Sequence, residues 1–261
     1  MASLNLEYSI ATHTDGLAAE SLALDQFQRF NTDILGLGNI SQEAEYLEAL
    51  VAMFDLEGFT TFCNQIDPHL VVPEYLDSFL RWLFDEIKAE LTVETKDNRM
   101  LLWARLPFFA KFMGDGILFL WNTKYADNIV DIGNIVISLH NICQRYKDNF
   151  VPELRINFTR PPQRLRCGIA RGQVISIGNG SDFVGSCINM AARLQKLGNL
   201  AFAFPRRGFN LTQCFPNEKR REEWIPKRVA IRGIGDEEII MVNRTEFQSL
   251  APEQQREFKD P

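Results

Sequence analysis

Apolar residues recur every three or four positions in three segments of the chain, which is the spacing typical of amphipathic helices. These segments span residues 73–91, 127–146 and 185–198. Pro73 suits the first turn of the first helix, and Gly198 closes the third. A further amphipathic helix is predicted over residues 21–36, with Leu24, Phe27 and Ile34 on one side.

Shorter apolar runs that stop at turn residues predict strands between these helices. Strands are predicted at the end of 40–54, in 92–121 and in 224–242, and 164–178 is predicted to form two strands around a turn at Gly172. The order of elements predicts an α+β fold in one domain. Residues 1–45 would form an N-terminal helical extension, residues 46–245 the domain itself, and residues 246–261 a short C-terminal helix and tail.

The composition narrows the classes of function. A net charge of −6 argues against a non-specific nucleic-acid binder, which needs a basic face. Five scattered cysteines and three distant histidines show no spacing of zinc ligands. The chain has no signal peptide and no apolar run that could span a bilayer, so the sequence predicts a soluble, cytoplasmic protein that binds neither membrane nor nucleic acid.

Asp115 lies between two glycines in the stretch KFMGDGILFLW. The Asp-Gly pair between apolar runs favours a tight hairpin turn, because such turns need positive φ. The run after it lacks alternating polar residues, which indicates a strand covered on both faces. In isolation Asp115 is a turn residue, but a carboxylate in such surroundings needs water, a partner or a metal.

Asp55 also ends an apolar strand, and the segment after it offers a predicted helix start. Backbone N–H groups of Gly58, Phe59 and Thr60 form a candidate phosphate site there, whereas the alternative is a helix N-cap aspartate. Two strand-end aspartates on neighbouring strands could hold two divalent cations. Their hard oxygen ligands favour Mg²⁺ or Mn²⁺ over zinc.

Asn189 and Arg193 are four residues apart on one predicted helical face. They form a candidate clamp for a ribose and a phosphate, although a solvated face is the alternative. Lys111 and Asp182 are candidate contacts to a base edge, or surface charges. One basic stretch is assigned mostly to a solvated face; its arginines are Arg155, Arg160, Arg164, Arg166 and Arg171.

Three segments resemble motifs of the class III nucleotidyl cyclase family, and they occur in that family's order. FDLEGFT resembles the first metal motif, KFMGDG the base-contact and second metal motif, and DFVGSCINMAARL the ribose-and-phosphate helix. The resemblance covers roughly residues 50–245. It implies a ferredoxin-like βαββαβ core, with a mostly antiparallel sheet flanked by helices.

The resemblance also implies roles for single residues. Asp55, Leu56 and Asp115 would hold two divalent cations, Mn²⁺ or Mg²⁺. Lys111 and Asp182 occupy the two positions that select the base.

Asn189 would orient the ribose, and Arg193 would stabilise the charge on the α-phosphate. Members of the family act as head-to-tail homodimers, in which one protomer supplies the metal ligands and its partner supplies the ribose, phosphate and base contacts. The implied reaction is attack of the ribose 3′-oxygen on the α-phosphorus, which gives a 3′,5′-cyclic nucleotide and pyrophosphate.

The substrate base stays open at this point. Lys111 with Asp182 is the pairing associated with adenylate cyclases, so ATP is the alternative substrate. The amino-acid sequences around the hairpin and the helix, KFMGDGILFLWNT and DFVGSCINMAARLQKL, are similar to those of the stand-alone bacterial pyrimidine cyclases of Pycsar anti-phage systems. This similarity favours UTP, then CTP, and a product read by a separate effector in antiviral defence.

Ile234 departs from the family pattern, because many relatives carry a phosphate-binding lysine there. Arg232 or Lys227 could replace it, or the chain could be a non-catalytic nucleotide sensor. A polymerase-like palm is a further alternative, but the hairpin carries only one acid.

Overall fold

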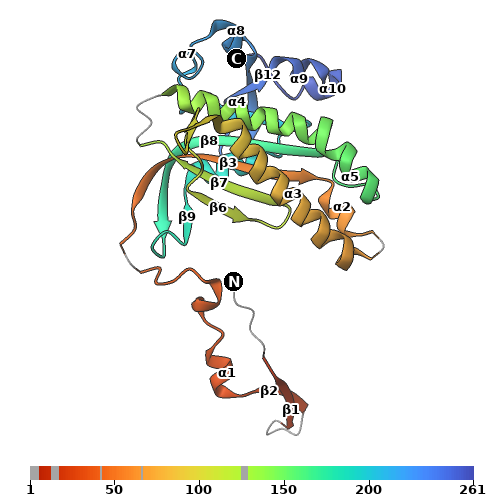
Figure 1. Cartoon of the computed structure of the whole chain (residues 1–261). Helices are drawn as coiled ribbons and strands as arrows, with labels where there is room; N and C mark the ends of the chain where they lie inside the picture. The colour runs from red at the N-terminus through yellow and green to blue at the C-terminus, as the bar shows by residue number, and fades with distance from the viewer. Residues whose placement is uncertain (1–5, 13–17, 42, 66, 125–128) are drawn as a thin grey trace. The chain divides into compact units, whose positions relative to one another are not determined.

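The computed structural model describes residues 6–12, 18–41, 43–65, 67–124 and 129–261 (Figure 1). It consists of two compact units. The larger contains Leu47–Val174 and Gly185–Pro261, and the smaller contains Met1–Tyr46 and Ile175–Val184. The three-part division predicted from the sequence stays a prediction. No helix among the described residues is long and apolar enough to cross a bilayer.

The sheet of the larger unit has the strand order β11-β12-β10-β8-β3-β7-β6. Its strands are β3 (Tyr46–Glu57), β6 (Phe109–Phe112), β7 (Gly116–Asn122), β8 (Arg164–Ile177), β10 (Phe202–Pro205), β11 (Trp224–Ile231) and β12 (Gly235–Asn243). In chain order, β3, β6, β7 and β8 occupy the spatial order 4-1-3-2, which is the ferredoxin-like βαββαβ arrangement. Most pairs are antiparallel, and β8 with β10 is parallel. The predicted fold class is confirmed.

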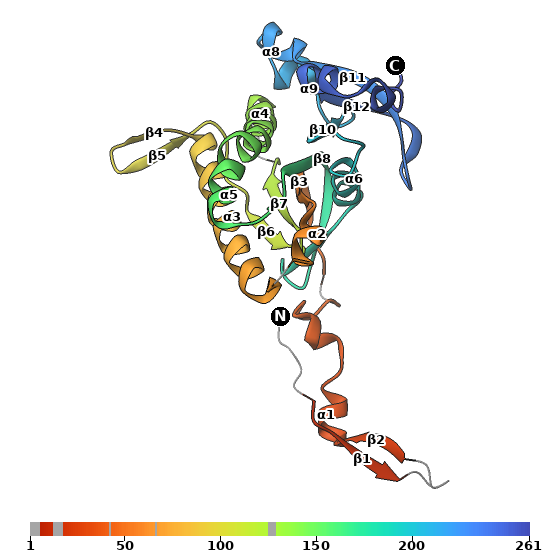
Figure 2. The same cartoon turned by 90° about the vertical axis from the view of Figure 1, so that its right-hand side faces the viewer.

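One face of this sheet is covered by α3 (Pro68–Leu91), α4 (Ile129–Arg145), the π-helical turn η2 (Tyr146–Phe150) and α5 (Val151–Asn157), as Figures 1 and 2 show. Alternate strand residues point into this core, such as Phe54 of β3, Phe119 of β7 and Cys167 of β8. The run Gly116–Trp121 is buried throughout, as its unbroken hydrophobicity predicts.

The opposite face carries α6 (Ser186–Leu194), which lies beside β8 (Figure 2). Gly168 makes this close packing possible, because a Cβ there would clash with the carbonyl oxygen of Ala191. Cys187, Met190 and Leu194 form the buried side of α6.

Several predicted boundaries differ from the observed ones. α3 begins at Pro68, which takes the first-turn position, so Pro73 lies inside the helix. α6 ends at Leu194 rather than at Gly198. The predicted start of α4 at Asp127 lies outside the described residues.

The prediction of two strands in 164–178 is also wrong. β8 is one continuous strand through this stretch. Gly172 does not turn the chain but lies beside the Cys187 side chain of α6.

Short elements complete the larger unit. β4 (Thr92–Lys96) and β5 (Arg99–Leu102) form a separate antiparallel hairpin. The short helices are α2 (Phe59–Cys63), α7 (Leu211–Cys214), α8 (Glu218–Glu222), α9 (Arg244–Ser249) and α10 (Pro252–Gln255).

The smaller unit corrects the predicted helical extension. It contains a hairpin of β1 (Tyr8–Thr12) and β2 (Ala18–Leu22), then α1 (Leu24–Gln28) and a 3₁₀ turn, Thr32–Leu35. Its last strand, β9 (Asp182–Val184), pairs with the end of β8. A single helix over 21–36 does not form, because the Asn31 side chain accepts the N–H of Asp33 and caps a new turn.

Glu246 in α9 gives the fold a specific pH dependence. Its carboxylate accepts the N–H of Ala201, and burial raises its pKa from 4.5 to about 7. Between these pH values the folded protein holds a proton that the unfolded chain releases. The stability from this group is therefore full below pH 4.5 and is lost as the pH rises to about 7.

We expect Glu246→Gln to remove this loss, because the amide oxygen can still accept the Ala201 N–H. Relative to wild type, the variant should gain on the order of 3 kcal/mol in free energy of unfolding between pH 4.5 and 8. Urea denaturation of both proteins across this range measures the gain. Buried His140, whose pKa is lowered to about 4, gives the opposite slope but cancels in the comparison. If the difference in free energy of unfolding between the two proteins did not change with pH, the assignment to Glu246 would be wrong.

Candidate functional site

Asp55 lies near the end of β3 on the face of the sheet opposite the α3–α4 core. Its neighbours Phe54 and Leu56 point into that core, so strand alternation turns Asp55 to the side of α6. Its side chain is only 4% exposed. A carboxylate so deeply buried needs a charged or hydrogen-bonding partner.

Asp115 lies directly beside Asp55 in the turn between β6 and β7. The Leu56 N–H donates to the Asp115 carbonyl oxygen at 3.0 Å, and Asp55 pairs with Gly116 across the strands. The two predicted metal aspartates are therefore brought together by the ends of two neighbouring strands. Because the Leu56 side chain is a hydrocarbon packed in the core, only its backbone carbonyl could serve as the predicted third ligand.

The two glycines of this hairpin have different structural roles. Gly114, at φ +91°, takes the turn position that needs positive φ, and the Met113 N–H closes the turn on the Gly116 carbonyl at 2.8 Å. The turn is thus Gly114–Asp115, rather than the Asp-Gly pair predicted from the sequence. Gly116 belongs to β7, where a Cβ would clash with the Phe54 carbonyl oxygen.

The predicted phosphate segment forms the start of α2. Gly58, at φ +87°, ends the strand and leads into the helix. Phe59 is buried and Thr60 is exposed. The first backbone N–H groups of a helix have no intrahelical acceptor and face outward. Cys63 at the end of α2 lies near Asp115, since burial and then the Asp115 carboxylate raise the pKa of its thiol.

Arg166 is the residue of this site that sequence reasoning assigned to a solvated face. Its Nη2 donates to Asp55 Oδ2 at 2.5 Å and its Nε at 3.2 Å, and its side chain is 17% exposed. Lys196, just after α6, lies 3.9 Å from Asp55 Oδ1. No clear signal in the sequence indicated this contact, because Arg164 and Arg166 alternate with Leu165 and Cys167 as they would on a strand with one solvated face.

The donor set suits a hard divalent cation. Two carboxylates and a backbone carbonyl lie at the strand ends, and Mg²⁺ commonly binds one or two carboxylates together with substrate phosphates and water. Among the described residues, no group of three or more histidine, cysteine or acidic side chains could enclose a metal alone. A cation bound by Asp55 would compete with Arg166 for that carboxylate.

Asn189 and Arg193 both lie on the exposed side of α6, as their spacing predicts. Within the described part of the chain, no side-chain hydrogen bond or ion pair joins either residue to Asp55 or Asp115. In one protomer, the candidate ribose and phosphate clamp is therefore not bonded to the aspartate pair.

The remaining predicted contacts lie on three further elements. Lys111 is half-buried in β6. In the smaller unit, Asp182 begins β9, and its carboxylate accepts the N–H of Phe183 at 2.9 Å. Lys227 pairs with Asp260 at 2.6 Å, so it is engaged away from any phosphate, whereas Arg232 is exposed in the β11–β12 turn.

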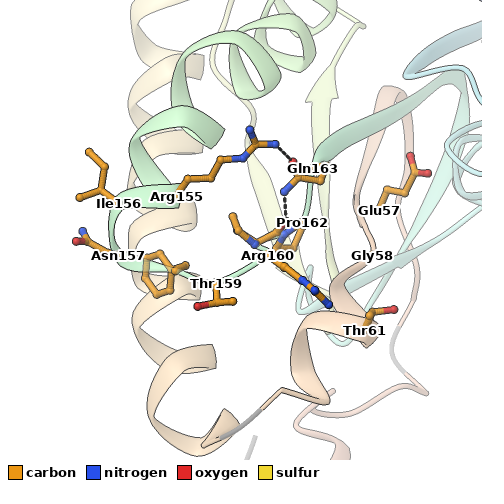
Figure 3. Close-up of a pocket in the computed structure, with 12 residues that line it drawn as sticks. Glu57, Gly58, Thr61, Arg155, Ile156, Asn157, Thr159, Arg160, Pro162 and Gln163 are labelled. Atoms are coloured by element: carbon orange, nitrogen blue, oxygen red, sulfur yellow. Dashed lines mark hydrogen bonds between the residues drawn. The ribbon is translucent and has the colours of Figure 1, made fainter.

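A cavity of about 800 Å³ opens beside the α2 segment. Glu57, Gly58 and Thr61 line one side of it, and Arg155 and Arg160 of the 155–163 segment line the other (Figure 3). These two arginines therefore border a concave surface next to the candidate phosphate segment, which the assignment to a solvated face did not anticipate.

No family model and no curated protein sequence matches the chain. Among solved structures it resembles the adenylyl cyclase CyaB from P. aeruginosa, with 15% identity and a TM-score of 0.54 over 77% of this chain and 96% of that one. It also resembles the catalytic core of a rhodopsin-guanylyl cyclase with converted specificity in complex with ATPalphaS, with 14% identity and a TM-score of 0.50 over 77% and 98% of the two chains.

A bacterial light-regulated adenylyl cyclase is similar at 15% identity and a TM-score of 0.50, over 79% of this chain. The chain spans 54% of that structure's length. The fold is that of a class III cyclase catalytic domain. The structural similarity establishes the fold, whereas identities of 14–15% do not establish the activity.

Proposed function

We propose that this chain is a nucleotidyl cyclase that converts a nucleoside triphosphate into a 3′,5′-cyclic nucleotide and pyrophosphate. The observation that carries the proposal is the adjacency of Asp55 and Asp115 at the ends of neighbouring strands, with Arg166 on the same carboxylate. A structural ion pair explains Asp55 and Arg166, but it gives no role to Asp115, whose backbone lies beside Asp55 where the two strands end.

Asp55, Asp115 and the Leu56 carbonyl would hold two divalent cations, Mn²⁺ or Mg²⁺. When bound, these would neutralise phosphate charge and favour ionisation of the attacking 3′-oxygen. The backbone N–H groups of Gly58, Phe59 and Thr60 would donate to phosphate oxygens.

Arg166 has two partners in this scheme. In the structure its guanidinium compensates the buried charge of Asp55. With substrate bound, its planar fork would turn to a phosphate oxygen a few ångströms away. Arg166 would thus compensate the buried charge of Asp55 in the free enzyme and stabilise the triphosphate in the complex. This role is consistent with the absence of a lysine at position 234.

The complete site would form between two copies of the chain. Asn189 and Arg193 lie exposed on α6 and unconnected to the aspartates, so a partner protomer would present them to the substrate. Asn189 would orient the ribose, and Arg193 would stabilise the charge that develops on the α-phosphate. Positioning and charge stabilisation would supply most of the rate.

The proposed substrate is UTP, with CTP next and ATP as the alternative. Lys111 and Asp182 would contact the base. The similarity of the hairpin and helix sequences to pyrimidine cyclases supports UTP, and a cyclic UMP messenger read by a separate effector in antiviral defence follows from that similarity. A nucleotide sensor without turnover is the second candidate, because position 234 carries isoleucine.

The test is to incubate the purified chain with Mn²⁺ and each of the four common triphosphates, and to separate the products by chromatography. A cyclic nucleotide from UTP, in greater yield than from ATP, is the expected result. A higher yield from ATP would replace the pyrimidine assignment. Tight binding of a triphosphate without any pyrophosphate release would favour the sensor.

A further inference from the structure

Three arginines converge on a second cavity of the larger unit, with a volume of about 680 Å³. Arg171 comes from β8, Arg206 from the segment after β10, and Arg221 from α8. The other described residues that line it are uncharged: Gly208, Phe209, Asn210, Leu211 and Thr212. The volume lies in the range of small-molecule sites, and the charge of the lining is entirely positive.

Hydrogen bonds to side-chain and backbone oxygens hold two of these arginines in place. Arg171 donates through Nε to the Thr123 hydroxyl at 3.3 Å and through Nη1 to the Gly208 carbonyl at 3.5 Å. Arg221 donates through Nη1 to the Phe215 carbonyl at 3.3 Å. Each guanidinium keeps further N–H donors for a ligand.

The loop that carries Arg206 packs closely against β8. The Phe209 N–H closes a turn on the Arg206 carbonyl at 3.3 Å, and Gly208 takes φ +82° in that turn. A Cβ at Gly208 would lie only 3.2 Å from the Arg171 carbonyl oxygen. The lining of the cavity is therefore largely pre-formed.

The three arginines of the cavity, Arg171, Arg206 and Arg221, have no acidic partner among the residues that the structure describes. Their sequence neighbours differ, because Arg207 pairs with Glu238 at 3.0 Å and Arg220 with Glu223 at 3.4 Å. In a chain with 34 acidic residues, three guanidinium groups left together without an acid repel one another, and a bound anion removes that repulsion.

We propose that this cavity is a binding site for a small phosphate-bearing anion, separate from the aspartate site. Planar guanidinium groups bind pairs of phosphate oxygens, and the Thr212 and Asn210 side chains offer further hydrogen bonds. Thr123, to which Arg171 is bound, follows the far end of β7 from Gly116, so the two sites lie at opposite strand ends. Binding here does not depend on the metal aspartates or on the proposed reaction.

The experiment is titration calorimetry with the full chain in EDTA, which removes divalent cations from the aspartate site. The probes are inorganic phosphate, pyrophosphate and uridine monophosphate, which distinguish a free phosphate from a nucleotide. We expect at least one to bind with submillimolar affinity. Arg206→Gln and Arg221→Gln should each weaken that binding about tenfold or more, the effect of losing one charge-assisted contact.

The matched controls are Arg207→Gln and Arg220→Gln, which remove the same charge one residue away from the cavity. We expect less than a twofold change for both. Circular dichroism and thermal melts check that all four variants fold. If the controls lost as much affinity as the cavity variants, the effect would come from the general charge of the protein and not from this site. If no probe bound to the wild-type chain, the proposed site would also be ruled out.

Discussion

Asp115→Asn is expected to abolish turnover while leaving the fold intact. The carboxylate lies in a turn that is closed by backbone groups, so an amide side chain preserves the hairpin. The change would remove a ligand of a cation that stabilises the charged transition state by several kcal/mol. We therefore expect kcat to fall at least about a thousandfold. Initial rates of pyrophosphate release with Mn²⁺ and the preferred triphosphate measure the loss.

Asp115 is a better target than Asp55, because Asp55→Asn would also leave the Arg166 charge without its partner in a buried position. Breaking such a pair costs about 3–5 kcal/mol of stability and would mix unfolding with lost catalysis. Asp97→Asn, in the turn of the β4–β5 hairpin, is the matched control and should keep full activity. Retained activity in Asp115→Asn would return Asp115 to the role of a turn residue.

The second large effect is expected from mixed dimers. Asp115→Asn and Arg193→Ala should each be inactive alone, since each damages one half of every composite site. In a heterodimer of the two variants, one site receives both damaged halves and the other receives both intact halves. Purified through two different affinity tags, this heterodimer should recover about half of the wild-type turnover per dimer.

The matched control for the mixed dimer pairs Asp115→Asn with Asp115→Ala. Both changes lie in the same half of the site, so no intact site forms and the heterodimer should stay inactive. An Asp115→Asn and Arg193→Ala heterodimer that is no more active than either variant alone would contradict the composite site. In that case the aspartates of one protomer would not share a site with α6 of its partner.

The core of the fold could be predicted because its information is local. The unbroken apolar run of β7 indicated a strand covered on both faces. The apolar residues along one side of each predicted helix indicated helices that cover the sheet. Asp55 and Asp115 could be placed at strand ends because both follow such runs. Their contact, however, depends on β3 pairing with β7 in one register, which the resemblance to a known family supplied.

Other features depend on long-range contacts that a pattern does not contain. Arg166 looked like part of a basic surface stretch until β8 was placed next to β3, where the side chain meets Asp55. Gly172 looked like a turn, but the strand continues through it because α6 packs closely there. In the N-terminal segment, the polar cap of Asn31 outweighed the apolar spacing that predicted one helix.

Cyclase activity is tested most directly by the stoichiometry of the reaction with the preferred triphosphate. Phosphorus NMR of the wild-type chain with the triphosphate and Mg²⁺, followed by mass spectrometry, identifies every product. We expect one 3′,5′-cyclic nucleotide and one pyrophosphate for each triphosphate consumed. Release of a nucleoside mono- or diphosphate without a cyclic product, or no turnover of any triphosphate, would rule out the proposed cyclase reaction.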